Sequence, residues 1–203
     1  SYYSYWKKKR IFDVSVTVII LIFLIIPILI TALVVFIDDP KGSPFYKQVR
    51  IGRHGKPFNM YKFRSMYVDA EKRKKDLMDS NEMDGPVFKM KNDPRITRVG
   101  RFIRKYSIDE IPQLFNVLVG NMSIVGPRPA LPEEVEKYSD YNKLRLVVTP
   151  GITCTWQIMP DKNDIPYEKW LEMDLEYIET RTTLKDIKII LKTPFAMLRA
   201  NGR

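Results

Sequence analysis

Two adjacent carboxylates, Asp109 and Glu110, lie near the middle of the chain, in the stretch of residues 108–117. Pro112 follows them and, because proline is tolerated only in the first turn of a helix, we expect Asp109 to be an N-cap and a helix to run from Glu110 to about Leu118. A helix start attracts anions, which are either the carboxylates themselves or a bound phosphate. Such a pair can attack phosphorus, hold a metal ion, or serve only as a helix cap and a first-turn acid.

Basic residues surround this pair in the sequence. Arg104 precedes Asp109 by five residues, Arg128 lies between two prolines, and Lys62 and Arg64 share one face of a predicted strand. Arginine binds phosphate oxygens through two parallel hydrogen bonds, and the flanking prolines restrict the backbone of Arg128, as a preorganised clamp requires. A single arginine is more often a surface ion-pair partner. Together with the carboxylates, these residues indicate phosphate chemistry.

The composition narrows the classes of function. The 203 residues carry 34 Lys and Arg against 24 Asp and Glu, a net charge of +10, so the partner is expected to be anionic: phospholipid, nucleotide phosphate or nucleic acid. Cys154 is the only cysteine and His54 the only histidine. An intramolecular disulfide is therefore excluded, and a Ser-His-Asp triad or a multi-histidine metal site has almost no residues to be built from.

An apolar segment near the N-terminus, residues 14–37, carries no charge and is long enough to cross about 30 Å of hydrocarbon. Its core is too long for a signal peptide. Pro27 predicts a kink, and positive residues flank the segment on both sides. Since positive residues prefer the cytoplasmic side, we favour a re-entrant helix that returns both flanks to the cytoplasm. A kinked spanning helix and a buried helix of a soluble core are the alternatives.

The rest of the chain predicts a small β-hairpin and several helices. Residues 45–50 predict a short strand, and residues 58–66 alternate bulky and polar side chains as a half-buried strand does, so the two are expected to pair as a hairpin. Helices are expected over residues 69–79, 99–106, 132–148, 166–180 and 183–198, and the last has an apolar face that suits core packing or a membrane interface. The expected fold class is α+β: a membrane-embedded, re-entrant N-terminal helix, a short β-hairpin, and a mostly helical domain with interfacial amphipathic helices.

Ordered motifs along nearly the whole chain resemble those of the bacterial sugar transferases. These are monotopic phosphoglycosyl transferases, which move a sugar 1-phosphate from a nucleotide sugar to polyprenyl phosphate. The matching motifs are Lys9-Arg10-Ile11-Phe12-Asp13, Tyr61-Lys62-Phe63-Arg64-Ser65-Met66, Asp93-Pro94-Arg95-Ile96-Thr97, residues 107–116, residues 120–129, and Thr149-Pro150-Gly151-Ile152-Thr153.

The resemblance implies a covalent mechanism. Asp109 would attack the sugar-proximal phosphate of a UDP-sugar, releasing UMP and forming an aspartyl-phosphosugar that polyprenyl phosphate then attacks. Glu110 would help to hold Mg²⁺, the metal that the family uses. Arg104 would bind a phosphate, such as that of the lipid, and Arg128 the nucleotide diphosphate. The resemblance also carries over Lys62, Arg64 and Asp174 as substrate-binding residues.

The resemblance further implies a membrane anchor over residues 1–40 and a cytoplasmic catalytic domain over residues 41–203. The enzyme would lie at the bacterial inner membrane and perform the first membrane step of polysaccharide or glycoconjugate biosynthesis. Its partners would be a UDP-sugar, polyprenyl (undecaprenyl) phosphate and phospholipid, but no nucleic acid. Two residues depart from the usual pattern: Ile26 replaces a serine before the anchor proline, and Cys154 replaces a glycine. The chain is compatible with a complete small enzyme and with the catalytic part of a longer one.

Two other functions fit parts of the sequence. The net charge of +10 also suits a non-catalytic, membrane-tethered module that binds anionic lipid or nucleic acid, whose affinity would fall steeply with salt and would not depend on Asp109. A metal-dependent phosphohydrolase at the membrane would release free sugar phosphate without a lipid acceptor.

Overall fold

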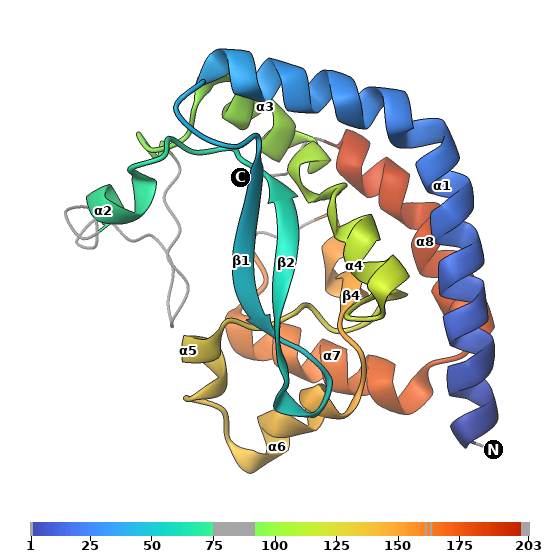
Figure 1. Cartoon of the computed structure of the whole chain (residues 1–203). Coiled ribbons are helices and arrows are strands. Elements are labelled where there is room, and N and C mark those ends of the chain that lie inside the picture. Colours follow the sequence, from blue (N-terminus) through green and yellow to red (C-terminus); the bar gives the residue numbers. More distant parts are fainter. Residues whose placement is uncertain (1, 75–91, 161, 163, 200–203) are drawn as a thin grey trace.

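The computed structural model describes residues 2–74, 92–160, 162 and 164–199 (Figure 1). Its helices are α1 (Tyr2–Asp38), α2 (Ala70–Lys74), α3 (Arg98–Lys105), α4 (Gln113–Val119), α5 (Pro132–Val135), α6 (Asp140–Lys143), α7 (Tyr167–Thr180) and α8 (Thr183–Leu198). Short 3₁₀ turns are η1 (Arg53–Gly55), η3 (Ile108–Glu110), η4 (Leu144–Val147) and η5 (Trp156–Ile158). The strands are β1 (Phe45–Ile51), β2 (Pro57–Phe63), β3 (Ser123–Val125) and β4 (Gly151–Thr153). The mixed α and β class is confirmed.

The apolar segment forms α1, which runs along one side of the domain and then turns across its top (Figure 1). Pro27 lies inside α1, where it removes one backbone donor. Ile28 and Val35 pack against Phe63 and Ile103, whereas most large apolar side chains of α1 are exposed. Within the described part of the chain, α1 is the one helix whose length and composition suit a membrane span.

A buried charge network fixes the N-terminal end of α1 to the domain. Lys9 Nζ lies 2.7 Å from a carboxylate oxygen of Asp186 in α8, and Tyr177 donates a hydrogen bond of 2.6 Å to the same carboxylate. Asp13 accepts a bond of 2.7 Å from the Ser123 hydroxyl in β3. Because an unpaired buried charge is costly, these partners hold α1 against β3, α7 and α8.

A second set of contacts fixes the C-terminal end of α1. The Asp38 carboxylate accepts a hydrogen bond of 3.1 Å from the backbone N–H of Val99, in the first turn of α3. Asp39 forms an ion pair of 2.9 Å with Arg64, just beyond β2. Both ends of the apolar helix are therefore attached to the same domain.

Two small sheets support the site. β1 and β2 pair antiparallel over their full length, so the predicted hairpin is confirmed, although β2 ends at Phe63 rather than Met66. β3 and β4 pair parallel, and Gly151 allows their close approach, because a Cβ there would lie 2.1 Å from the Gly126 nitrogen. One core cluster joins β2, α4, β3, α7 and α8 and includes Met60, Val117, Met122, Val125, Tyr177 and Ile189.

The helix predictions succeed in part. Those for residues 99–106, 166–180 and 183–198 are confirmed by α3, α7 and α8. The single helix predicted over residues 132–148 is wrong, because the chain forms α5, α6 and η4 instead. The Ser139 hydroxyl accepts a hydrogen bond of 3.2 Å from the Asn142 N–H and so begins a new helix where we expected a continuous one. Of the helix predicted over residues 69–79, residues 70–74 form α2, while residues 75–79 lie outside the described residues.

Candidate active site

The carboxylate pair lies in η3, a 3₁₀ turn, and not at the start of an α-helix. Ser107 precedes this turn with φ 54°, a left-handed conformation that is unusual for a residue other than glycine, and Pro112 is the N-cap of α4. The predicted N-cap role of Asp109 is therefore wrong, because Ser107 reverses the chain after α3 and the turn ends before α4 begins. A backbone held in this region at a cost of about 1–3 kcal/mol is typical of functional sites.

Asn116 attaches the segment with the carboxylates to the hairpin. Its Oδ1 accepts a hydrogen bond of 2.9 Å from the Tyr61 N–H, and its Nδ2 donates one of 2.7 Å to the Asn59 carbonyl. Asn116 is fully buried and so links α4 directly to the middle of β2. This link places Lys62, the next residue of β2, beside the carboxylates.

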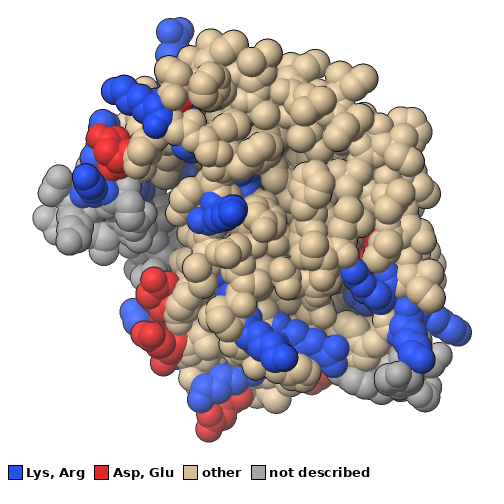
Figure 2. Space-filling view, in the orientation of Figure 1, with Lys and Arg blue, Asp and Glu red and all other residues tan. Residues whose placement is uncertain are grey.

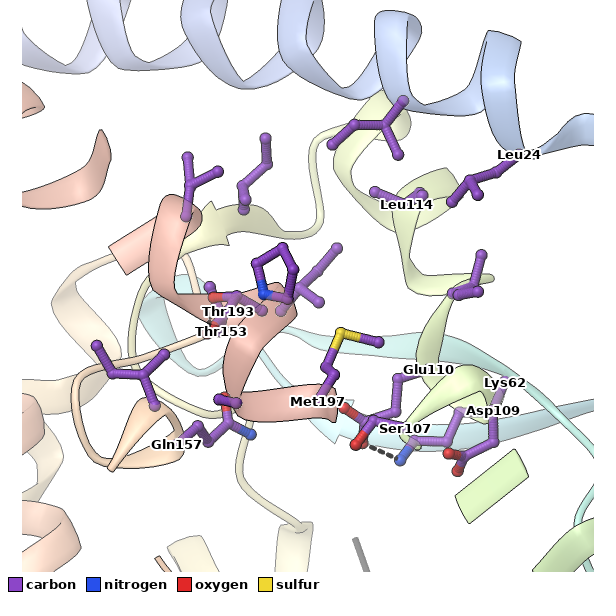
Figure 3. A pocket seen from close by; sticks show the side chains of 18 of the residues that line it. Leu24, Lys62, Ser107, Asp109, Glu110, Leu114, Thr153, Gln157, Thr193 and Met197 are labelled. Carbon is purple, nitrogen blue, oxygen red and sulfur yellow. Dashed lines mark hydrogen bonds and ion pairs between the residues drawn. The ribbon is translucent and has the colours of Figure 1, made fainter. Parts of the chain in front are cut away.

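Lys62 Nζ lies 2.7 Å from Glu110 Oε1 and makes an ion pair with it (Figure 3). Asp109, Ser107 and Lys62 lie together with Glu110 at one end of a cavity, and Arg104 also lines it. Asp109 is only 7% exposed. Four of the predicted site residues therefore line the same cavity: Lys62, Arg104, Asp109 and Glu110.

The two carboxylates differ in acidity. Burial raises the pKa of Asp109 to about 6, and the charge of Glu110 adds to this rise, while Lys62 and Arg104 oppose it. Burial also opposes the ionisation of Glu110, but the charge and hydrogen bond of Lys62 hold the pKa of Glu110 below its usual range. Neighbouring acids whose pKa values are pushed apart are typical of sites in which each acid has its own role.

The cavity has a volume of about 750 Å³, and most of its wall is apolar. α1 and α8 supply much of this wall: Ile19, Ile20, Phe23, Leu24, Ile190, Pro194, Ala196 and Met197. The polar end carries Lys62, Arg104, Asp109, Glu110 and Lys162. The cavity can therefore hold a ligand with an anionic head and an apolar body.

The other predicted residues, Arg128, Arg64 and Asp174, are not among the residues that line this cavity. Arg128 makes an ion pair of 3.4 Å with Glu134, and its positive charge contributes to the lowered pKa of Glu110. Arg64 binds Asp39, and the fully buried Asp174 binds Arg145, so neither belongs to the described lining of the cavity.

Our sequence analysis did not single out Lys162 or, as a lining residue, Ser107. Lys162 lies in a polar loop between η5 and α7 that carries no recognisable pattern. The cation is found only when the fold brings the loop to the polar end of the cavity.

The acid pair also bears on the expected metal. No cluster of three or more His, Cys, Asp or Glu side chains suited to a metal occurs among the described residues, so the protein has no all-protein metal cage there. Mg²⁺ is often held by one or two carboxylates together with water and substrate phosphates. Glu110, whose lowered pKa keeps it ionised, and Asp109 fit that mode of binding.

Most of the surface over α1 is uncharged, as the apolar cavity wall that α1 supplies is. Figure 2 shows a broad uncharged face over α1, with Lys and Arg gathered nearer its ends and along the lower edge. The fold and site thus define a class of protein: one with a carboxylate pair, flanked by cations, at the end of an apolar cavity that a long apolar helix walls.

The comparisons with known proteins identify the family. The family model described as bacterial sugar transferase matches residues 4–200, and the chain belongs to that family. It is 46% identical over 200 residues to the galactosyl transferase CpsE of Streptococcus agalactiae, covering 98% of this chain and 44% of the relative. It is 43% identical over 198 residues to the undecaprenyl-phosphate galactose phosphotransferase of Salmonella typhimurium, covering 96% of this chain and 41% of the relative.

A shorter relative matches along most of its own length. The sugar transferase EpsL of Bacillus subtilis is 40% identical over 195 residues, which is 96% of this chain and 89% of EpsL. The chain thus spans less than half of the two longer relatives and most of this shorter one.

Proposed function

We propose that this protein transfers a sugar 1-phosphate from a UDP-sugar to polyprenyl (undecaprenyl) phosphate and releases UMP. The observation that carries the proposal is the position of Asp109, a buried acid beside Lys62 and Arg104 at the end of an apolar cavity walled by α1. The relative from Salmonella typhimurium is named for the same kind of transfer, with galactose and undecaprenyl phosphate.

In the proposed first step, a carboxylate oxygen of Asp109 forms a bond to the sugar-bearing phosphorus of the donor. The bond from that phosphorus to the bridging oxygen breaks, and UMP leaves with this oxygen. Lys62 and Arg128 offset the negative charge of the transferring group, and Mg²⁺ bound at Glu110 would supply further neutralisation. The step needs ionised Asp109, which a pKa of about 6 provides at neutral pH.

In the second step, a phosphate oxygen of the acceptor attacks the same phosphorus and the Asp109 carboxylate leaves, which restores the enzyme. The apolar wall of α1 and α8 suits the prenyl chain, because apolar surface buried there is removed from water or from the membrane interface. Arg104 lines the same cavity near Asp109 and is the residue we assign to the acceptor phosphate.

The attachment of α1 supports a re-entrant anchor. Lys9 and Asp13 at one end, and Asp38 and Asp39 at the other, bind groups of one compact domain. A helix that crossed the membrane once would leave its two ends on opposite sides, where a single domain could not bind both. We therefore propose that the domain lies on the cytoplasmic side, where positive flanks are favoured.

Intact-mass analysis tests the function. The detergent-solubilised protein is mixed with Mg²⁺ and a panel of UDP-sugars without lipid acceptor, and the expected result is a sugar-phosphate adduct on Asp109 together with UMP. Adding polyprenyl phosphate should discharge the adduct. Free sugar phosphate without acceptor would instead favour a phosphohydrolase. A protein that forms no adduct and releases no UMP, but binds anionic vesicles or nucleic acid in a salt-dependent way, would favour a binding module.

A further inference from the structure

The backbone around Arg128 is held at every carbonyl from residue 127 to residue 130. The Pro127 carbonyl accepts a hydrogen bond of 2.9 Å from the Gly151 N–H, and the Ala130 carbonyl accepts one of 2.9 Å from the Ile51 N–H. Between them, the carbonyls of Arg128 and Pro129 accept bonds from side chains rather than from backbone groups. Four consecutive carbonyls are thus bound, two of them by the adjacent residues Arg50 and Ile51 of β1 and the other two by Arg145 and Gly151.

The two side-chain donors are buried guanidinium groups. Arg145 donates from Nη2 to the Arg128 carbonyl at 3.2 Å and is itself ion-paired with the buried Asp174. Arg50 donates from Nη1 to the Pro129 carbonyl at 3.0 Å and from Nη2 to Gln48 Oε1 at 2.8 Å. This arrangement gives Asp174 a role away from substrate, because it neutralises the arginine that holds the Arg128 carbonyl.

Arg50 differs from Arg145 in its surroundings. It is 6% exposed, none of the described residues forms an ion pair with it, and its Nε has no hydrogen-bond acceptor within the described chain. Burial and the charge of Arg128 together lower the pKa of Arg50 to about 9, while the charges of Glu134 and Glu110 partly oppose this shift. Two buried or half-buried cations therefore lie close together, and the nearby carboxylate of Glu134 is already ion-paired with Arg128. Holding Arg50 in this place is costly unless a further anion lies close to both arginines.

A diphosphate bound near Arg128 would be such an anion. It would offset both positive charges when the donor is present, while the bond to the Pro129 carbonyl fixes the backbone from which the Arg128 side chain projects. Pre-ordering a binding side chain lowers the conformational cost that the ligand must otherwise meet.

We infer that Arg50 is a positioning residue that orders the segment of residues 127–130, so that Arg128 is held ready for the diphosphate of the nucleotide donor. The inference rests on the proposed function, since it assigns the diphosphate to Arg128. It makes Arg50 act through Arg128 and not by its own contact with the ligand.

A double-mutant cycle tests this inference, with the dissociation constant of UDP as the measured quantity. We expect Arg50→Gln and Arg128→Gln each to weaken UDP binding about tenfold or more, as loss of charge-assisted hydrogen bonding does. In the Arg128→Gln background, Arg50→Gln should change the affinity by less than about twofold, because residues that act as one unit are not additive. Lys47→Gln is the matched control, since it removes an exposed cation from the other face of β1.

Gln48→Ala provides a milder variant if Arg50→Gln does not fold. It leaves the Arg50 charge in place and removes one of its two acceptors, so UDP binding should weaken by a few fold, and again only when Arg128 is present. Equal losses in both backgrounds would overturn the inference and make Arg50 a direct ligand. Unchanged affinity of both the Arg50 and Gln48 variants would also overturn it. If Arg128→Gln itself leaves UDP binding unchanged, the proposed donor site fails, and that result is distinct from the other two.

Discussion

At the scale of single residues, the acid pair is the feature with the clearest consequences. Asp109 and Glu110 are neighbours in sequence, yet burial governs the first and the ion pair with Lys62 governs the second. Sequence alone cannot separate them, because both residues have similar pKa values in water. The fold gives the two acids different pKa values by burying Asp109 and by pairing Glu110 with Lys62.

Asp109→Asn should abolish adduct formation and at the same time stabilise the protein. The native pKa of about 6 lies above the ordinary value of 3.8, so ionising Asp109 at neutral pH costs folding free energy, and the difference corresponds to about 3 kcal/mol at most. A neutral Asn avoids this cost. Thermal unfolding at pH 7.5 should therefore occur several degrees higher, while intact mass should show no adduct.

The stabilisation by Asp109→Asn should shrink as the pH falls from 6 towards 4, since wild-type Asp109 becomes protonated in the native state over that range. Glu136→Gln, at an exposed position, is the control and should leave both stability and activity unchanged. An unfolding temperature for Asp109→Asn equal to or below that of wild type would contradict the assigned burial effect.

The rate of the proposed attack by Asp109 on the donor should depend on pH through the ionisation of Asp109 itself. Because the ionised carboxylate is the attacking form and burial raises its pKa to about 6, the single-turnover rate of UMP release should fall about tenfold for each pH unit below about 6. Rapid-quench measurements between pH 4.5 and 8 check this. A rate that stays flat down to pH 4.5 would mean that Asp109 titrates normally or is not the nucleophile.

At the scale of elements, Asn116 determines where the acids lie, because it binds two backbone groups of β2 from within α4. Asn116→Ala should leave the Tyr61 N–H and the Asn59 carbonyl without their partner, at a cost of about 2–4 kcal/mol, and lower the rate of adduct formation. Denaturant unfolding and single-turnover kinetics measure the two effects. Asn121→Ala, at an exposed asparagine nearby, should change stability by less than about 0.5 kcal/mol.

The elements also show where sequence patterns suffice. α8 was predicted with its observed bounds because a polar cap and an apolar periodicity are local signals. η3 was missed because the left-handed Ser107 and the bond network around Asn116 depend on distant residues. The break at Ser139 was missed because a capping serine within an apolar pattern resembles an ordinary helical residue.

The candidate site was predicted only in part for the same physical reason. Asp109, Glu110 and Arg104 lie close in sequence, so a local motif finds them together. Lys62 lies beside them because β2 contacts their segment, and there it pairs with Glu110. The predicted strand face shared by Lys62 and Arg64 did not indicate this pairing, and Arg64 pairs with Asp39 instead. Contacts between residues far apart in the sequence determine which cation lies beside which acid. Local sequence patterns do not reveal such contacts.

At the scale of the whole molecule, the attachment of both ends of α1 predicts a measurable topology. In a Cys154→Ala background, which removes the buried native thiol, Lys8→Cys and Lys41→Cys place one exposed thiol at each end of α1. In inverted membrane vesicles, a membrane-impermeant maleimide should label both positions. Labelling of one position only, with the other reached from the opposite side of the membrane, would establish a spanning helix instead.

The ion pair between Lys9 and Asp186 has a consequence for how the protein is made. Its partners are 177 residues apart, so Lys9 leaves the ribosome long before Asp186 is synthesised. During that interval α8 is not yet available to bind the N-terminal end of α1. The N-terminal end of α1 therefore gains this ion pair only after the segment with Asp109 and Glu110 has been made, and the same helix, α8, also completes the apolar wall of the cavity.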